Sequence, residues 1–304
     1  MPYAQGVNQN TYIKLEGVGG TLDPAVDWVP LRLITNGLNQ SIEELESDEM
    51  LPGRHMAESR SGVSSVAGDL EAELTYGTFD MLLEAAFHGT WTANVLKTGS
   101  TRRKFAILKH NEDIGRWLVY RGCEVGTVAI DCPLQGKIGI TFSMIGTKEE
   151  AYTFNALTES IADPTETVMM TTFEGSLTEG GTGLNHATAL NLSLDNGMEA
   201  IYRLFSRDAY DIKLGRINVS GSLSAYIEDN RLKDKYLGET KTPLVVTLTD
   251  GENSYQISMT QAKLTTSSEE GSGDDPIIQN YDYRAFNDPA VGTEVTITRI
   301  PAAP

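Results

Sequence analysis

The chain has 304 residues, of which 40% are hydrophobic, and this length favours two domains, each large enough to bury its own core. The formal net charge of −18 argues against a protein that wraps nucleic acid, because such binding needs Lys and Arg side chains to neutralise phosphates. No stretch approaches the roughly 20 apolar residues of a membrane-spanning helix, and the N-terminal segment lacks the basic and apolar regions of a secretory signal, so we expect folding in a cytoplasm.

The first half begins with β-rich segments around a long loop. Residues 33–38 and a strand near Ile42 precede the segment 46–62, which has no clear helical or strand period. Loops longer than about 12–15 residues are usually functional or disordered. This one mixes apolar and charged residues, a composition that favours ordering by a partner over a merely mobile loop. The candidate contact residues are Met50, Leu51, Pro52, Arg54, His55 and Met56.

A strand is predicted over residues 66–74, because apolar residues recur there at alternate positions. Its opposite face carries Asp69, Glu71 and Glu73. These carboxylates are candidates for an acidic channel wall, and the alternative is an ordinary solvent-facing side.

A helix is predicted over residues 78–87, where five apolar residues form one face and Gly89 is a plausible stop. A hairpin follows, from 105–108 to 117–120, and a strand over 137–145 closes the first domain. We therefore place the first domain at residues 1–150.

The segment 151–170 is polar and acidic, with Asp163-Pro164 breaking regular structure, and is predicted to be a linker. The second domain, residues 171–304, has a strand over 219–227, a short helix over 229–237 and a last strand over 294–300. Between them, 244–248 leads through Asp250-Gly251 to 255–257, a strong hairpin signal.

The two halves resemble each other in sequence, which is typical of an internal repeat. Residues 66–74 match 219–227 at an offset of 153 positions, and Gly68 corresponds to Gly221. Upstream, 33–38 matches 193–198 at an offset of 160, which predicts a connecting segment seven residues longer in the first half. Because the order of strand, helix and hairpin also recurs, we predict a tandem duplication; chance similarity between two β-rich domains is the alternative.

Repeated units of strand, long loop, strand, helix and hairpin resemble the phage tail tube protein family. The pattern from Asn36 to Trp91 carries most of this resemblance, and residues 171–300 carry it more weakly. The fold class expected is mainly β (α+β), with two tandem tail-tube-like β-sandwich or barrel domains, each flanked by a short helix and a hairpin. Many such subunits have a single tube domain, so the length of this chain is a departure.

The resemblance implies a non-enzymatic virion protein of the tail, assembled in the host cytoplasm. Tube domains of this kind pair strands across subunits around a channel, and rings usually have six. Three copies with two domains each would then form one pseudo-sixfold ring, and the long loop would reach the neighbouring ring. The partners implied are the chain itself and the tail tip, tape measure and tail terminator proteins. DNA would pass through without specific binding, because an acidic wall repels its phosphates.

Signatures of catalysis are missing from the sequence. The Gly-rich segments 17–20 and 175–183 lack the Lys and Ser/Thr of a P-loop, and neither a GxSxG nor an HExxH pattern occurs. The four histidines are scattered, so we expect no metal and no cofactor, and Cys123 and Cys132 are expected as free thiols. Two alternatives remain open: a monomeric two-domain β-sandwich that serves as a decoration or adhesin module, and an enzyme without a readable motif.

Overall fold

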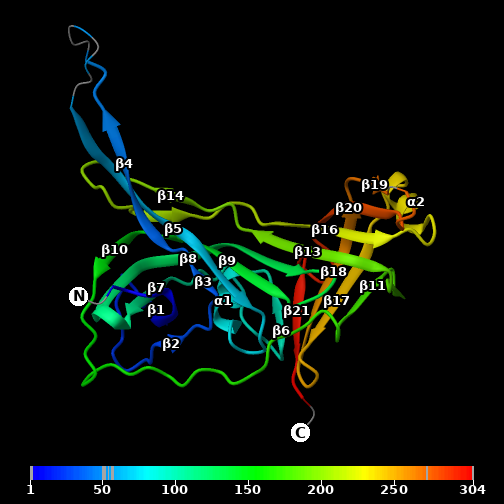
Figure 1. Cartoon of the computed structure of the whole chain (residues 1–304), viewed down its shortest axis with the longest axis horizontal. Helices are drawn as coiled ribbons and strands as arrows, with labels where there is room; N and C mark the ends of the chain where they lie inside the picture. Colours follow the sequence, from blue (N-terminus) through cyan, green and yellow to red (C-terminus); the bar gives the residue numbers. More distant parts are fainter. Residues whose placement is uncertain (1–2, 50–52, 54, 56–57, 272, 303–304) are drawn as a thin grey trace.

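The computed structural model describes residues 3–49, 53, 55, 58–271 and 273–302. The chain is mainly β, as predicted. Apart from a separate strand pair over 199–201 and 211–213, its strands are joined by antiparallel pairings into one extended sheet system that contains both halves (Figure 1).

The strands of the first half, in chain order, are β1 (Gln9–Leu15), β2 (Val29–Pro30), β3 (Thr35–Asn36), β4 (Asn39–Glu46), β5 (Ser59–Glu73), β6 (Val95–Lys97), β7 (Phe105–Asn111), β8 (Arg116–Cys132), β9 (Gly139–Gly146) and β10 (Lys148–Ala151). Those of the second half are β11 (Ser176–Glu179), β12 (Thr182–Gly183), β13 (Ala187–Asp195), β14 (Glu199–Ile201), β15 (Asp211–Lys213), β16 (Asn218–Tyr226), β17 (Thr242–Thr249), β18 (Ser254–Leu264), β19 (Ser268–Glu270), β20 (Ile278–Ala285) and β21 (Thr296–Ile300). The α-helices are α1 (Asp80–Ala86) and α2 (Arg231–Leu237), and the 3-10 helices are Gly6–Asn8 and Glu112–Ile114.

Both halves have the same pairing scheme. In the first half β5 lies between β4 and β9, β8 pairs with β7, β9 and β10, and β1 pairs with β7. In the second half β16 lies between β13 and β20, β18 pairs with β17, β20 and β21, and β11 pairs with β17. The β7–β8 and β17–β18 pairs even have a register shift at corresponding places.

The registers give the equivalent residues of the two halves. Gly68 of β5 and Gly221 of β16 correspond at the predicted offset of 153, but the preceding strands correspond at 154, so that Leu38 matches Leu192. The predicted offset of 160 for this segment, and the seven-residue difference derived from it, are therefore wrong. Both segments contain an Asn-Gly pair, but at different places: Asn36-Gly37 precedes β4, whereas Asn196-Gly197 follows β13.

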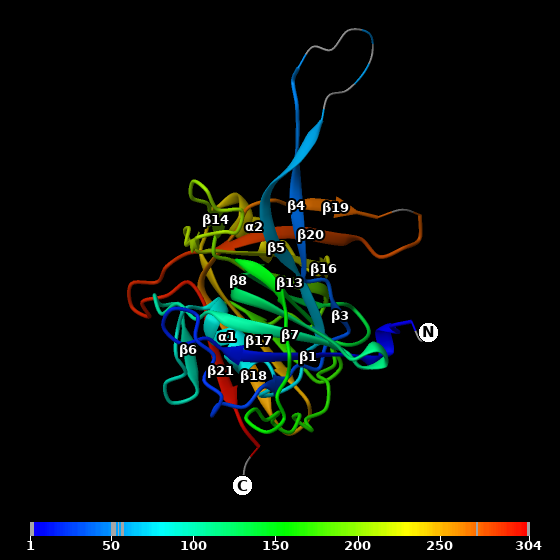
Figure 2. The ribbon, with the colours of Figure 1, turned by 90° about the vertical axis from the view of Figure 1, so that its left-hand side faces the viewer.

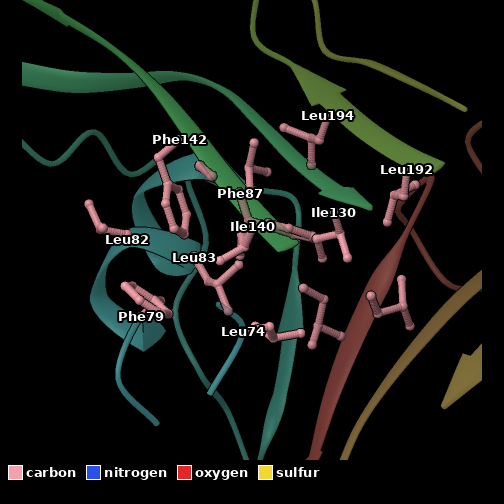
Figure 3. Close-up of a cluster of buried hydrophobic side chains, with 14 of the residues drawn as sticks. Leu74, Phe79, Leu82, Leu83, Phe87, Ile130, Ile140, Phe142, Leu192 and Leu194 are labelled. Carbon is pink, nitrogen blue, oxygen red and sulfur yellow. The ribbon is translucent and has the colours of Figure 1, made fainter. Parts of the chain in front are cut away.

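The halves are joined through a strand pair. The C-terminal part of β8, from Thr127 to Cys132, pairs with β13, from Asp195 back to Leu190. Alternate residues of both strands face one hydrophobic core that contains side chains of both halves. Figure 3 shows Ile130 of β8 and Leu192 of β13 pointing into the same cluster. Since every second side chain of a strand is buried in this way, the register of the junction is strongly specified.

The helix α1 covers this junction on the core side. Its bounds are shorter than the predicted 78–87, but its apolar face is the predicted one: Phe79, Leu82, Leu83, Ala86 and Phe87 are all buried. In the second half α2 begins two residues later than predicted, and Leu232 is its buried residue. The predicted hairpins are present as β7–β8 and β17–β18. The loop predicted over 46–62 is shorter, because 59–62 extend β5.

The segment 152–170 runs across the first half. It forms isolated bridges from Ile161 to Trp28 and from Met169 to Thr75. The Trp28 indole N–H donates to Glu159, and Tyr152 contacts the Trp28 ring edge-on. The predicted linker is thus a strap that covers a second, smaller apolar cluster around Trp28. The domain boundaries at 150 and 170 remain a prediction.

Candidate assembly surface

One face of the sheet is polar and acidic. In β5 the side chains of Asp69 and Glu71 are exposed and Glu73 is half-buried, whereas Val66, Leu70 and Ala72 on the other face are buried. The alternation predicted for this strand is therefore present. Opposite Asp69 and Glu71 on β9 lie small polar residues, Ser143 and Thr141.

The same polar face continues through the second half, where the pairings place Ser, Thr and Asn side chains beside further carboxylates. Exposed or half-buried acidic residues on it are Asp131 of β8, Asp195 of β13 and Asp282 of β20. Arg284 of β20 and Lys137, which pairs with Glu73, are basic residues near it. The sheet thus presents one wide, mostly acidic surface spanning both halves.

Of the described strands of this sheet that have one open edge, β4 and β19 lie at opposite ends of the sheet, and the others are the short strands β2, β3, β6, β10 and β12. Among the described residues, β4 pairs only with β5, and β19 pairs only with β20. By the shared scheme, β4 is the counterpart of β13, and β19 is the counterpart of the C-terminal part of β8. These counterparts pair with each other inside the chain, so the two open edges are complementary.

Lys109 of β7 lies at the start of the β4 edge. Its ammonium donates to the carbonyl oxygens of Leu38, at 2.9 Å, and Asn36, at 3.4 Å. Burial lowers the pKa of Lys109, although Glu149 opposes this. At the other edge β19 carries Glu269 and Glu270, both exposed. Lys109 thus places one positive charge at the start of β4, although the exposed Glu43, Glu44 and Glu46 follow along that strand.

Each half also has an arm. The first arm, residues 42–63, comprises the ends of β4 and β5 and the loop between them; the second arm, residues 196–217, contains β14 and β15. The pairing of Leu45 with Arg60 in the first arm corresponds to that of Glu199 with Lys213 in the second. The ends of β4 and β5 in the first arm stand away from the rest of the molecule (Figure 2), whereas the second arm bends back over the first half.

The second arm is held by hydrogen bonds and ion pairs. The backbone N–H of Ser64 donates to the Arg207 carbonyl at 2.9 Å, and the Ser64 hydroxyl donates to Asp208 at 2.8 Å. At the loop end of the β14–β15 pair, Lys104 pairs with Asp211 at 2.6 Å, and Arg102 bridges Asp211 and the buried Glu124.

These contacts change the acidity of Asp211. Burial alone would raise its pKa, but the hydrogen bonds from Lys104 and the Ile212 N–H, with the charge of Arg102, lower the pKa to about 2. Asp211 is therefore ionised at neutral pH and holds the arm to two cations of the first half.

The predicted contact residues of the long loop are only partly described. Met50, Leu51, Pro52, Arg54 and Met56 lie outside the described residues, and His55 is exposed. Their contact role therefore remains a prediction. Strand edges that pair across subunits were expected from the resemblance, but β4 and β19 were not identified as their carriers. Residues 58–74 match 211–227 over a longer stretch than the one recognised from sequence.

Comparison with known families decides which of the expected classes applies. A family model described as phage tail tube protein matches residues 6–285. The chain belongs to the phage tail tube protein family. No curated protein matches it.

As a member of the tail tube family, the protein is a structural component of the virion tail. No cluster of three or more metal-ligating side chains occurs within the described ranges. No described helix is long and apolar enough to cross a membrane. The acidic face, the open edges of β4 and β19 and the two arms are surfaces of this tail tube protein on which other molecules could act.

Proposed function

We propose that three copies of this chain form a closed, pseudo-sixfold ring and that such rings stack into a hollow tube through which DNA passes. The protein then acts as a structural subunit and not as an enzyme. The observation that carries this proposal is the β8–β13 junction, because it pairs the counterparts of β4 and β19, each of which has an open outer edge.

The internal junction supplies a register for the contact between copies. Ser193 of β13 lies opposite Ala129 of β8, and their counterparts are Asn39 of β4 and Ser268 of β19. In the ring, β4 of one copy pairs antiparallel with β19 of the next, with Asn39 opposite Ser268. Such a head-to-tail contact forms a closed ring when its rotation divides a full turn, and the ring covers the open edges of β4 and β19.

The acidic face is then the wall of the channel. Asp69, Glu71 and Glu73 line it, together with the carboxylates of the second half. Fixed negative charges on the wall repel the phosphate backbone, so the DNA slides and does not adhere. In this proposal the first arm reaches the neighbouring ring through the candidate residues around His55. The tail tip, tape measure and tail terminator proteins are the partners at the ends and inside the tube, and assembly takes place in the host cytoplasm.

Electron microscopy of the purified chain tests the proposal. We expect rings or hollow filaments whose rings contain three chains and six similar lobes, and the mass of isolated rings should equal three chains. Six complete chains in each ring would contradict the trimeric arrangement. Single particles at every concentration would contradict self-assembly and would favour a decoration or adhesin module.

A further inference from the structure

The seat of the second arm has a counterpart in the second half. On the first half, the seat consists of Arg102, Lys104 and Glu124, and it binds Asp211. The registers of β7–β8 and β17–β18 place Lys241 at the position of Lys104 and Lys263 at that of Glu124.

The counterpart keeps the net charge of the original seat. Arg102 lies two positions before Lys104, and the residue two positions before Lys241 is Glu239. The Glu239 carboxylate pairs with the Lys263 ammonium at 2.8 Å. In the first half the pair is Arg102 with Glu124, so acid and base have changed places, but each set of three retains one excess positive charge. Lys241 is exposed; its ammonium lies 5.0 Å from the centre of the Phe286 ring and in the field of Asp288.

The first arm carries the matching acid. The offset of 153 that relates β5 to β16 makes Glu58 the counterpart of Asp211, and Arg60 and Gly62 the counterparts of Lys213 and Gly215. Glu58 is exposed, and the first arm stands away from its own chain (Figure 2). Within one copy, therefore, the acid on the first arm and the seat on the second half both face solvent.

We infer that the first arm of one copy docks on the second half of the adjacent copy, with Glu58 bound to Lys241 beside Lys263. This inference rests on the proposed ring, because the pairing of β4 with β19 would place the first arm beside the start of β17, as the β8–β13 pairing places the second arm beside the start of β7. The occupant of the seat is thus a second copy of this chain, selected by charge complementarity and by continuity with the strand junction.

Charge reversal tests this contact in the full chain. We compare the unchanged protein with Glu58→Lys, Lys241→Glu and the double variant, and measure the concentration at which rings form by light scattering and electron microscopy. Glu252→Lys, at the exposed β17–β18 turn, is the matched control for the change in net charge. Circular dichroism shows whether each variant is folded.

Each single reversal replaces an attraction by a repulsion at a partly exposed site, so it should raise the assembly concentration about threefold or more. The double variant should restore it to within about twofold of the unchanged protein, and the control should leave it unaltered. If the unchanged chain forms rings and the single reversals do so equally well, or if their effects add in the double variant, the docking contact is wrong but the ring stands. If the unchanged chain forms no rings, the proposed function fails and this inference fails with it.

Discussion

The two arms are the same hairpin in two orientations. Their strands pair in equivalent registers, but the second arm bends over its own chain and the first projects from it. The bend occurs where Gly197 has a left-handed φ of 56° and Gly215 packs against its backbone. The first arm has Gly62 at the position of Gly215 but Glu43 at that of Gly197. A residue with a Cβ avoids this region, so one position helps to decide which arm covers its own chain and which is available to a neighbour.

The largest expected effect comes from adding a Cβ at Gly215, in the bend of the second arm. A Cβ at Gly215 would lie 2.3 Å from the carbonyl oxygen of Gly197, whereas one at Gly62 would lie 3.1 Å from Leu45 Cγ, a side-chain atom on an exposed hairpin. Gly215→Ala should therefore cost about 2 kcal/mol, and Gly62→Ala should stay within about 0.5 kcal/mol. Urea denaturation measures both. Equal losses would show that the two glycines have the same role.

Exchanging the residues that differ sharpens the comparison. Gly197→Glu places in the second arm the residue that the first arm has, and the left-handed conformation then costs about 1 kcal/mol. Amide hydrogen exchange should become faster at residues 199–213, while exchange in β7 stays unchanged. Unaltered protection of the arm would show that the backbone at this position does not determine the bend.

A smaller effect is expected from the ion pairs that Asp211 of the second arm forms with the first half. Asp211→Asn removes the charge that binds Lys104 and Arg102, and because the side chain is partly exposed the loss should be about 0.5 kcal/mol. Lys213→Met, two residues along the same strand, is the control, since its contact with Glu199 is exposed. Hydrogen exchange of β15 should distinguish the two variants, and identical behaviour would contradict a specific seat.

Lowering the pH should loosen the second arm as Asp211→Asn does, and this should be the smallest of the four effects. The folded-state pKa of Asp211, about 2, lies below its unfolded value near 3.9. Its contribution is therefore complete above about pH 4 and is lost as the pH falls towards 2. Protection of residues 199–213 should decrease over this interval in the unchanged protein but not in Asp211→Asn. The same acid profile in both would show that another group is responsible.

Local elements were predictable because local patterns determine them. The alternation around Leu70, the apolar face of α1 and the Asp250-Gly251 turn each specify one element, and the family resemblance followed from their order. The β8–β13 junction was not predictable, because nothing near Ile130 shows that Leu192 pairs beside it. The upstream match failed because two Asn-Gly pairs have different roles. The Asn36 side chain bonds Thr11 and the Leu38 N–H, whereas Gly197 bends the second arm.

The central claim is that the contact between copies repeats the junction inside the chain, and a disulfide cross-link tests it most directly. Cysteines at Asn39 and Ser268 should face each other across β4 and β19 of adjacent copies, within the roughly 4.4–6.8 Å between Cα atoms that a disulfide requires. On oxidation we expect covalent dimers and trimers. Cysteines at Asn39 and Glu269, one position out of register, should form far fewer, because their side chains leave opposite faces of the sheet. Monomers alone from the first pair, or equal cross-linking of both pairs, would contradict the account.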